Sequence, residues 1–378
     1  MKPVLPGGTI GIVGGGQLAR MMALEARRMG YRVAVLDTDP HGSAGEVVDV
    51  FVQGSLSDAS ALRRLADVSD VITLDTEHVA AELLSDIEAS TPVRPGAAVM
   101  RIVQDRLMQR EFLRELGVPQ TAYVELSTAA DFDLIAERVG FPCVIKTRRS
   151  GYDGKGQARA YSKDELASAW RSIDEQPAVA EAFVDFEKEV SYLLARGIDG
   201  EMREYAMSEN NHRNHVLHTS IVPAGTAQQV VDCGQIARSI AEQLGHVGVM
   251  AVEFFITREG APLVNEIAPR THNSGHWTFD AAETSQFEQH LRAVCGLALG
   301  GTATLFPSAM LNLLGDLWQN GTPDWRHVFA HPHAHLHLYG KKRAAAGRKM
   351  GHVLVYDDQS TSRALQSATE LFANLGGK

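Results

Sequence analysis

Two apolar runs that each carry one glutamate lie between positions 249 and 273, which read VMAVEFFITREGAPLVNEIAPRTHN. They hold Glu253 and Glu266, and a hairpin turn at Arg258 to Gly260 joins them. An acid in a strand otherwise suited to burial is costly unless it is paired or binds a metal. Two such acids on neighbouring strands, beside Asn265, make an oxygen-ligand site of the kind that Mg²⁺ prefers when it also holds substrate phosphates. We therefore expect a hairpin that carries a magnesium site.

A second stretch predicts a phosphate-binding loop. An apolar run from Cys143 to Ile145 ends in Lys146, and the chain continues with TRRSGYDGKGQ. Closely spaced glycines let backbone N–H groups turn inward with no Cβ in the way, which suits a loop that closes over phosphates. The lysine would add a point charge for the same anion. Taken alone, the stretch could also be a surface hairpin with a flexible tip.

The N-terminal part of the chain has the pattern of an open α/β domain. Thr9 to Val13 and Arg32 to Leu36 read as strands, a helix of about Ser57 to Ala66 follows, and Asp70 to Leu74 reads as a further strand. Such alternation of strands and helices is typical of a parallel sheet. The segment from Thr91 to Gly96 contains two prolines, ends this pattern and marks a domain boundary.

The turn after the first strand resembles a dinucleotide-binding fingerprint. Gly14, Gly16 and Ala19 are followed, about twenty residues later, by Asp37. This spacing offers the alternative of an NAD-dependent protein with a Rossmann-type domain. A helix N-terminus after a glycine turn binds any phosphate or polar ligand, however, so the motif is weak evidence for nicotinamide. Nothing later in the chain looks like a hydride-transfer site.

The segment from Ala97 to Leu116 is predicted to form one amphipathic helix, which Gly117 ends. Beyond it lies a predicted βαβ-like unit, made of a strand at Ala122 to Leu126, a helix of about Ala129 to Val139, the strand that ends in Lys146, its glycine loop, and Ala158 to Tyr161. Another helix, Lys163 to Ser172, precedes a strand at Ala178 to Val184. Small α+β lids that carry a lysine strand and a glycine loop cover nucleotides and exclude water.

Acidic residues after the lid extend the case for a nucleotide site. At the end of the last lid strand, the segment EAFV could pair its backbone with an adenine edge while an acidic side chain takes ribose hydroxyls. Glu189 follows in an alternating strand, which would place it on the same face as Glu187. His212 lies in NNHRNHVLH and could equally be a surface residue. Each acid alone could be a solvated strand residue, but their number and order favour the nucleotide site.

Composition limits the remaining classes of function. A chain of 378 residues exceeds a single core and predicts two or three domains. Its net charge of −10 argues against a protein that coats nucleic acid, and no apolar run is long enough to span a membrane. Cys143, Cys233 and Cys295 form neither a disulfide framework nor a zinc motif. With no signal-peptide pattern either, the chain is predicted to be cytoplasmic.

Four histidines alternate near the C-terminus, at His331, His333, His335 and His337. In a strand they would share one face, which makes a row of transition-metal ligands conceivable. The sequence offers no accompanying cysteine or carboxylate, so a purely structural strand is the favoured interpretation.

The order of these motifs resembles that of an ATP-grasp enzyme. The lysine strand, GYDGKGQ, EAFV, VMAVEFF and NEIAPRTHNSGHWT follow one another as in that superfamily. GIVGGGQLARM at the start and HLHLYGK with GRKMGHV near the end extend the resemblance over nearly the whole chain. They make the chain similar to the ATP-dependent 5-(carboxyamino)imidazole ribonucleotide synthetase family, the ATPase subunits of phosphoribosylaminoimidazole carboxylase. In two departures, TLDTEHV stands where relatives often read TYEFENV, and alanines at 344–346 replace a basic residue.

The resemblance implies an ATP-grasp fold of mixed α/β and α+β class. Residues 1–96 would form an N-terminal open parallel α/β domain that binds substrate, 97–300 the ATP-grasp domain with its lid at about 120–184, and 301–378 a small β-rich C-terminal domain. The implied reaction is the ATP- and bicarbonate-dependent carboxylation of the amine of 5-aminoimidazole ribonucleotide through carboxyphosphate, in purine biosynthesis. Mg²⁺ is the implied cofactor, and a homodimer is expected. Another ATP-grasp carboxylate-amine ligase is the alternative.

The same resemblance assigns the site residues. ATP would be bound by Arg106, Lys146, Gly151, Tyr152, Asp153, Gly154, Lys155, Gly156, Gln157, Glu181, Ala182, Phe183, Val184, Glu189, His212, Asn265 and Glu266. The metal would be held by Glu253 and Glu266. The candidates for the ribonucleotide are Gln17, Leu18, Glu77, Tyr152, Asp153, Arg270, His272, Asn273, Lys341 and Arg348. The catalytic candidates are Lys146, Asp153 and Arg270, of which Arg270 can stabilise carboxyphosphate.

Overall fold

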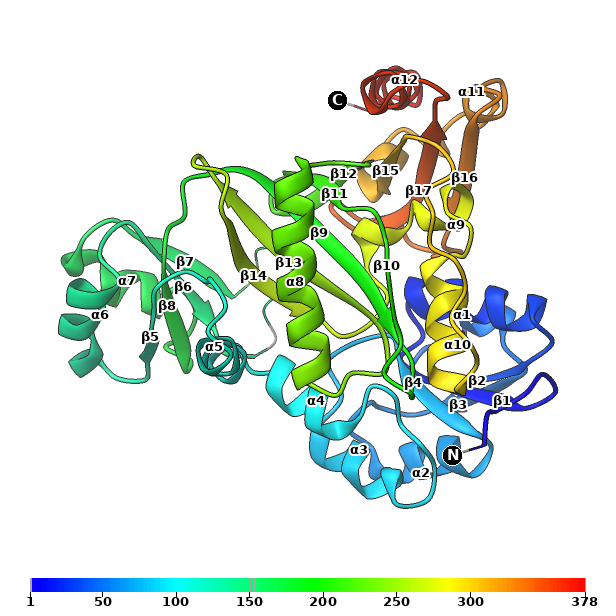
Figure 1. Cartoon of the computed structure of the whole chain (residues 1–378), viewed down its shortest axis with the longest axis horizontal. Coiled ribbons are helices and arrows are strands. Elements are labelled where there is room, and N and C mark those ends of the chain that lie inside the picture. The colour runs from blue at the N-terminus through cyan, green and yellow to red at the C-terminus, as the bar shows by residue number, and fades with distance from the viewer. Residues whose placement is uncertain (1, 150, 152–153, 155, 378) are drawn as a thin grey trace.

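The computed structural model describes residues 2–149, 151, 154 and 156–377 and arranges them around three sheets (Figure 1). The N-terminal sheet is parallel, and the two sheets that follow it are antiparallel. The predicted mixture of α/β and α+β architecture is confirmed.

The N-terminal sheet has the strand order β3-β2-β1-β4. Its strands are β1 (Thr9–Val13), β2 (Arg32–Asp37), β3 (Val50–Gln53) and β4 (Val71–Leu74). They alternate with α1 (Gln17–Arg28) and α2 (Ala59–Asp67), and α3 (Ala81–Glu88) follows. The strands β1, β2 and β4 are almost fully buried, as expected for a parallel sheet that is covered on both faces. This pattern confirms the strands and helices predicted for the N-terminal part.

The predicted single helix from 97 to 116 is wrong. The structure has two helices there, α4 (Ala97–Val103) and α5 (Arg106–Glu115). Between them Asp105 adopts an extended conformation, and its carboxylate accepts hydrogen bonds from the backbone N–H groups of the first turn of α5. Arg148 holds the same carboxylate at 2.7 Å. An aspartate in this N-cap position starts a new helix, and the amphipathic pattern of the sequence does not reveal the break.

The second sheet forms a small lobe with the strand order β5-β8-β6-β7. Its elements are β5 (Tyr123–Leu126), α6 (Phe132–Arg138), β6 (Cys143–Thr147), β7 (Gln157–Ala160), α7 (Leu166–Arg171) and β8 (Ala178–Ala182). Because β8 lies between β5 and β6 and is antiparallel to both, the predicted βαβ-like unit is split. Both helices cover the outer face of this sheet (Figure 1), and the lobe has an apolar core of its own.

The third sheet has nine strands and forms the centre of the molecule. Eight of them follow the order β14-β13-β9-β11-β12-β15-β17-β16, and β10 pairs with β9. The strands are β9 (Phe186–Arg196), β10 (Met202–Glu204), β11 (Ser208–Arg213), β12 (Val216–Val222), β13 (Gly248–Thr257), β14 (Pro262–Ala268), β15 (Ser308–Leu314), β16 (Ala334–Leu338) and β17 (Lys349–Tyr356). The predicted hairpin of β13 and β14 is confirmed. The C-terminal strands continue this sheet through β15, which pairs with β12.

The remaining α-helices follow strands of the central sheet, and some of them also pack against its neighbours. They are α8 (Ala227–Gln243), α9 (Thr278–Ala281), α10 (Gln286–Cys295), α11 (Arg326–Phe329) and α12 (Thr361–Asn374). One apolar core runs from α2, α3 and α4 to α8 and β13, and a second packs α1 against α10. The N-terminal and central sheets are therefore parts of one packed body, whereas the lid lobe has a separate core.

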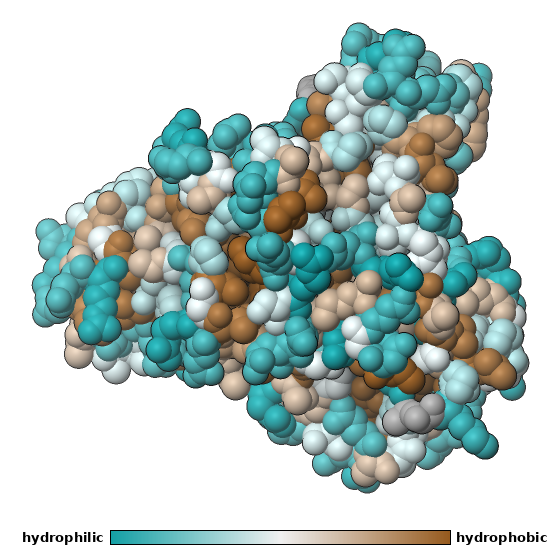
Figure 2. Space-filling view, viewed as in Figure 1, coloured by the Kyte–Doolittle hydropathy of each residue, from teal (hydrophilic) through white to brown (hydrophobic). Residues whose placement is uncertain are grey.

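The face seen in Figure 2 mixes hydrophilic and hydrophobic residues over all three lobes. Among the described helices, none is both long enough and apolar enough to cross a membrane.

The histidine row differs from its prediction in two ways. Only His335 and His337 lie within β16, because the strand begins at Ala334. A carboxylate does accompany them, since Asp280 lies 2.7 Å from Nε2 of His337 and 3.5 Å from Nδ1 of His335. The described residues nevertheless include no group of three or more histidines, cysteines or acids that could hold a metal. The favoured interpretation, a purely structural strand, stays a prediction.

Candidate active site

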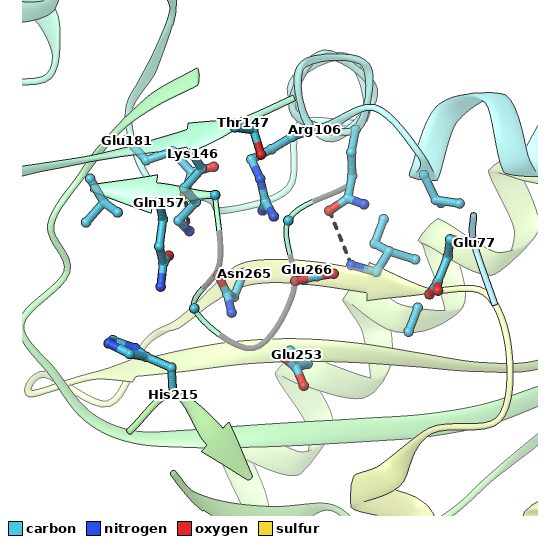
Figure 3. A pocket seen from close by; sticks show the side chains of 18 of the residues that line it. Glu77, Arg106, Lys146, Thr147, Gln157, Glu181, His215, Glu253, Asn265 and Glu266 are labelled. Atoms are coloured by element: carbon cyan, nitrogen blue, oxygen red, sulfur yellow. Dashed lines mark hydrogen bonds and ion pairs between the residues drawn. The ribbon is translucent and has the colours of Figure 1, made fainter. Parts of the chain in front are cut away.

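A cleft of about 800 Å³ lies where the three sheets approach one another. Figure 3 shows Lys146 and Glu181 from the lid on one side of it, with Glu253, Asn265 and Glu266 from the β13–β14 hairpin on the other. The sequence predicted residues of this kind, and the fold brings them into one space.

The hairpin places its two acids directly opposite each other. Glu253 and Glu266 are register partners of β13 and β14, at a point where the ladder shifts by one residue. The Glu253 side chain keeps 20% of its surface exposed, toward the cleft. Burial, and then the charge of Glu266, raise the pKa of the Glu253 carboxyl to about 7. Two close carboxylates in a partly dry site create a demand for a cation.

This donor set fits magnesium. Glu253 and Glu266 offer carboxylate oxygens, and Asn265 also lines the cleft, so protein ligands would fill part of an octahedron. Mg²⁺ commonly takes one or two carboxylates together with substrate phosphates and water, which agrees with the absence of a larger ligand cluster among the described residues.

Two basic side chains, one from α5 and one from β6, contact the buried carboxylate of Glu181. Its Oε2 lies 2.6 Å from Nζ of Lys146, and its Oε1 accepts a hydrogen bond of 2.7 Å from Nε of Arg110. Burial acts to raise the pKa of Glu181, but the charges of Arg110 and Lys146 outweigh it and lower that pKa. The carboxylate is thus fully engaged. The predicted use of an acid of the EAFV segment for ribose hydroxyls does not suit this side chain.

Glu189 is a second acid of this region that lines the cleft. Its carboxylate lies 2.9 Å from Nδ1 of His212 on β11. Burial acts to lower the pKa of His212, but the bond to Glu189 outweighs it and raises that pKa. The predicted common face of Glu187 and Glu189 is wrong. The pairing of β9 with β13 shifts at this point, so Glu189 lines the cleft while Glu187 is exposed.

Two arginines present buried donors to the cleft. Nε of Arg106, at the start of α5, and Nε of Arg270, after β14, are buried, and neither makes a hydrogen bond within the described part of the chain. Arg270 also forms an ion pair of 2.8 Å with Glu77. Buried donors without partners are rare in folded proteins, so both positions suit anionic ligands.

The opposite end of the cleft joins the N-terminal and C-terminal parts. Nζ of Lys341 donates to Oε1 of Gln17 at 2.8 Å and to the carbonyl of Lys349 at 2.7 Å. Burial, and then the nearby charge of Arg348, lower the pKa of Lys341 to about 8. Asn273 is held by Asn312 through two reciprocal amide hydrogen bonds of 3.1 and 2.7 Å.

The glycine turn before α1 is occupied by the chain's own carboxylates. Asp37 accepts a hydrogen bond from the N–H group of Gly15, and Asp75 accepts from those of Gly16 and Ala19. A Cβ at Gly16 would lie 2.5 Å from the Asp75 carboxylate, which explains the glycine there. A pyrophosphate would have to displace these acids, so the dinucleotide alternative has no site at this turn.

The predicted residues divide into three groups. Most of them line the cleft, namely Gln17, Leu18, Glu77, Arg106, Lys146, Gly151, Gly154, Gly156, Gln157, Glu181, Ala182, Phe183, Val184, Glu189, His212, Glu253, Asn265, Glu266, Arg270, His272 and Asn273. Lys341 and Arg348 do not line it, although Lys341 bonds to Gln17, which does. Tyr152, Asp153 and Lys155 lie outside the described residues.

Several residues of this region were not predicted from the sequence, among them four with side chains that can carry a charge. Asp75, His215 and Lys349 line the cleft, and Arg110 pairs with Glu181 behind it. Lys349 stands in the basic segment GRKMGHV, so the charge of that segment was the available signal. Arg110 gave no signal, because an arginine on an amphipathic helix usually faces solvent.

Three family models match successive parts of the chain. They describe a ribonucleotide synthetase preATP-grasp domain at residues 8–104, an ATP-grasp domain at 111–287 and a phosphoribosylaminoimidazole carboxylase C-terminal domain at 308–366.

Curated relatives and solved structures match at full length. The N5-carboxyaminoimidazole ribonucleotide synthase of Bacillus subtilis is 38% identical over 99% of this chain and 98% of its own length, and that of Brucella melitensis is 41% identical over 92% and 96%. The N5-carboxyaminoimidazole synthetase of Staphylococcus aureus, solved with ADP, is 35% identical and superposes with a TM-score of 0.92 over 99% of both chains. The Aspergillus clavatus enzyme, solved with ADP and 5-aminoimidazole ribonucleotide, is 30% identical, with a TM-score of 0.89 over 98% of both chains.

Proposed function

Because the chain belongs to the N5-carboxyaminoimidazole ribonucleotide synthases, ATP-grasp ligases that carboxylate 5-aminoimidazole ribonucleotide in purine biosynthesis, we propose which residues of its cleft carry out each step. The observation that carries the proposal is that the paired acids Glu253 and Glu266 face the Lys146 strand across a single cleft. This arrangement provides cation-binding oxygens on one side and phosphate-binding charges on the other.

The nucleotide binds between the lid and the central sheet. Lys146 and Arg106 take phosphate oxygens, and Glu189 with His212 takes the ribose. The backbone of Ala182 to Val184 borders the adenine, while Gly151, Gly154, Gly156 and Gln157 border the phosphates. Tyr152, Asp153 and Lys155 belong to the same proposal.

Glu253 and Glu266, with Asn265, would hold magnesium. When bound, the ion would supply positive charge that neutralises the phosphates. Phosphoryl transfer needs positioning and charge neutralisation more than covalent help, so the cations of this cleft supply most of what the reaction requires.

The carboxyl group is activated before it reaches the amine. A bicarbonate oxygen attacks the γ-phosphorus, the bond to ADP breaks, and carboxyphosphate forms. The Arg270 guanidinium, held by Glu77 at 2.8 Å, stabilises this dianion. The amine nitrogen of the ribonucleotide then bonds to the carboxyl carbon, the bond from that carbon to the phosphate oxygen breaks, and the departing phosphate takes the amine proton. The lid excludes the water that would hydrolyse the intermediate.

The ribonucleotide occupies the end of the cleft near α1. Gln17, Leu18, His272 and Asn273 line that end, and Lys341 and Arg348 supply positive charge behind it for the substrate phosphate. Lys349 joins this set from its place in the lining.

Bicarbonate-dependent ADP release tests the proposal. We expect release that requires both bicarbonate and 5-aminoimidazole ribonucleotide at full rate, and loss of it in Lys146→Ala and Arg270→Ala. An ATP-grasp ligase with another substrate pair would not respond to the ribonucleotide, and that result would overturn the proposal.

The proposal also covers the setting of the enzyme. All three cysteines are buried and free, which supports a reducing compartment such as the cytoplasm. The family resemblance supports a homodimer, which light scattering can test. It also supports domain limits at about residues 96 and 300, which limited proteolysis can test.

A further inference from the structure

One buried arginine connects the lid lysine with the metal-binding strand. Arg110 lies on α5 with only 1% of its surface exposed. Its Nε donates to Glu181 at 2.7 Å, and its other two nitrogens donate to the carbonyls of Val264 at 3.0 Å and Asn265 at 2.9 Å. Glu181 belongs to β8 of the lid, and Val264 and Asn265 belong to β14. A single guanidinium fork therefore joins the two walls of the nucleotide cleft.

The charges around Glu181 show what this contact does for the lysine. Arg110 and Lys146 each carry a positive charge and Glu181 carries a negative one, so the three together have one net positive charge. The arginine contacts one carboxylate oxygen and the lysine contacts the other. If the arginine were missing, Lys146 and Glu181 would form a neutral buried pair. The lysine would then lose most of its attraction for a phosphate.

The contact with β14 acts on the metal site. The carbonyl of Asn265 immediately precedes Glu266, and the same helix adds a second fixing point, since Gln109 accepts a hydrogen bond of 3.2 Å from the N–H group of Ile267. The acid Glu266 is thus flanked on both sides by backbone groups that α5 holds in place.

We propose that Arg110 is a positioning residue for the nucleotide. It offsets the negative charge of Glu181, so that the Lys146 ammonium can attract a phosphate, and it fixes the backbone beside the metal-binding acid Glu266. Arg110 does not itself line the cleft, and it acts through Lys146 and Glu266. The inference rests on the proposed placement of the nucleotide at Lys146.

A second substitution that restores the net positive charge of the group distinguishes this role from a packing role. Arg110→Met keeps most of the side-chain volume but removes the net charge, and we expect the Kd for ADP and the KM for MgATP to rise about 10- to 100-fold. Adding Glu181→Gln removes the matching negative charge and leaves Lys146 as the only charge of the group. We expect the double variant to recover at least tenfold in ADP affinity. A packing role would make the second substitution neutral or harmful.

The matched control is Arg114→Met, on the same helix, where the arginine forms an exposed ion pair with Glu111. It should leave nucleotide affinity unchanged. The KM for the ribonucleotide should stay within about twofold in every variant, because no contact of Arg110 reaches that end of the cleft. Thermal unfolding with and without ADP confirms that each protein is folded.

Two results would overturn the inference: wild-type ADP affinity in folded Arg110→Met, or no recovery in the double variant. If Arg110→Met does not fold, the double variant and Arg110→Lys, which both keep one net positive charge, decide the question. Affinity more than tenfold below that of the wild type in both would refute the charge argument. Unchanged ADP affinity in Lys146→Ala would instead refute the proposed placement of the nucleotide.

Discussion

Replacement of Glu266 by glutamine should stop turnover and, at the same time, stabilise the ligand-free fold at pH 8. Burial, and then the like charge of Glu266, raise the pKa of Glu253 from 4.5 to about 7. The Glu253 carboxyl therefore binds its proton more tightly in the folded protein than in the unfolded chain. The stabilising contribution of the protonated carboxyl is fully present below about pH 4.5 and is lost as the pH rises through about 7.

The size of the effect follows from the same shift. The full rise in pKa corresponds to about 3 kcal/mol of lost stability above pH 7, at about 1.4 kcal/mol per pH unit. Burial is the larger cause and persists in the variant, so the charge of Glu266 accounts for only part of this loss. We expect Glu266→Gln to raise the free energy of unfolding at pH 8 by on the order of 1 kcal/mol, which corresponds to less than one pKa unit of relief. At pH 5, where Glu253 is already protonated, the gain should nearly vanish.

Urea unfolding at both pH values, with EDTA present, measures the stability, and ADP release at saturating magnesium measures the activity. Glu259→Gln, on the exposed turn of the same hairpin, is the control for loss of a carboxylate that faces solvent. A variant that is destabilised at pH 8, or that gains equally at both pH values, would refute the repulsion between the two acids. Wild-type turnover at low magnesium would refute their role as metal ligands.

Three further predictions concern the other parts of the structure. Lys341→Ala should raise the KM for the ribonucleotide about 10- to 100-fold with little effect on the KM for ATP. Arg348→Ala should have a weaker effect, because Arg348 is exposed. An unchanged KM for the ribonucleotide in both variants would show that this segment is a solvated loop with no role in binding. In the wild type, kcat/KM for the ribonucleotide should fall as the pH rises above about 8, where Lys341 loses its proton, and a pH profile that is flat up to pH 9.5 would contradict this. Asp105→Ala should lower the free energy of unfolding by about 1 to 2 kcal/mol in urea titrations, because α5 loses its N-cap. An unchanged midpoint would contradict this and show that water accepts the freed N–H groups equally well.

The parts of the site that the sequence predicted are those fixed by local rules. The hairpin turn predicted that Glu253 and Glu266 lie on the neighbouring strands β13 and β14. Their direct pairing was not predictable, because it depends on the register shift between Glu253 and Phe254. Lys146 was predictable for a similar reason, since it stands at the end of an apolar strand with glycines after it. In both cases a short segment determines the geometry.

The parts that the sequence did not predict depend on partners far along the chain. Glu181 was expected to be free for a ligand, but Arg110, 71 positions earlier, engages it. The break before α5 is reinforced by Arg148, which lies 43 positions away. Glu187 departs from the strand pattern because a register shift against β13 interrupts the alternation. Amphipathic periodicity contains no information about such pairings, since it reports only which face is apolar.

The glycine turn before α1 shows how side chains decide what a common backbone can bind. The turn offers inward N–H groups next to a helix N-terminus, which in itself suits a phosphate. Here Asp37 and Asp75 accept those hydrogen bonds, and the burial of Asp75 raises its pKa against the pull of the N–H groups. The turn therefore presents negative charge where a dinucleotide fold presents donors. It is left to hold Gln17 at the start of α1, where that side chain meets Lys341 from the C-terminal part. A backbone suited to an anion has thus become a support for a residue that contacts Lys341, which is why the motif alone was weak evidence for a cofactor.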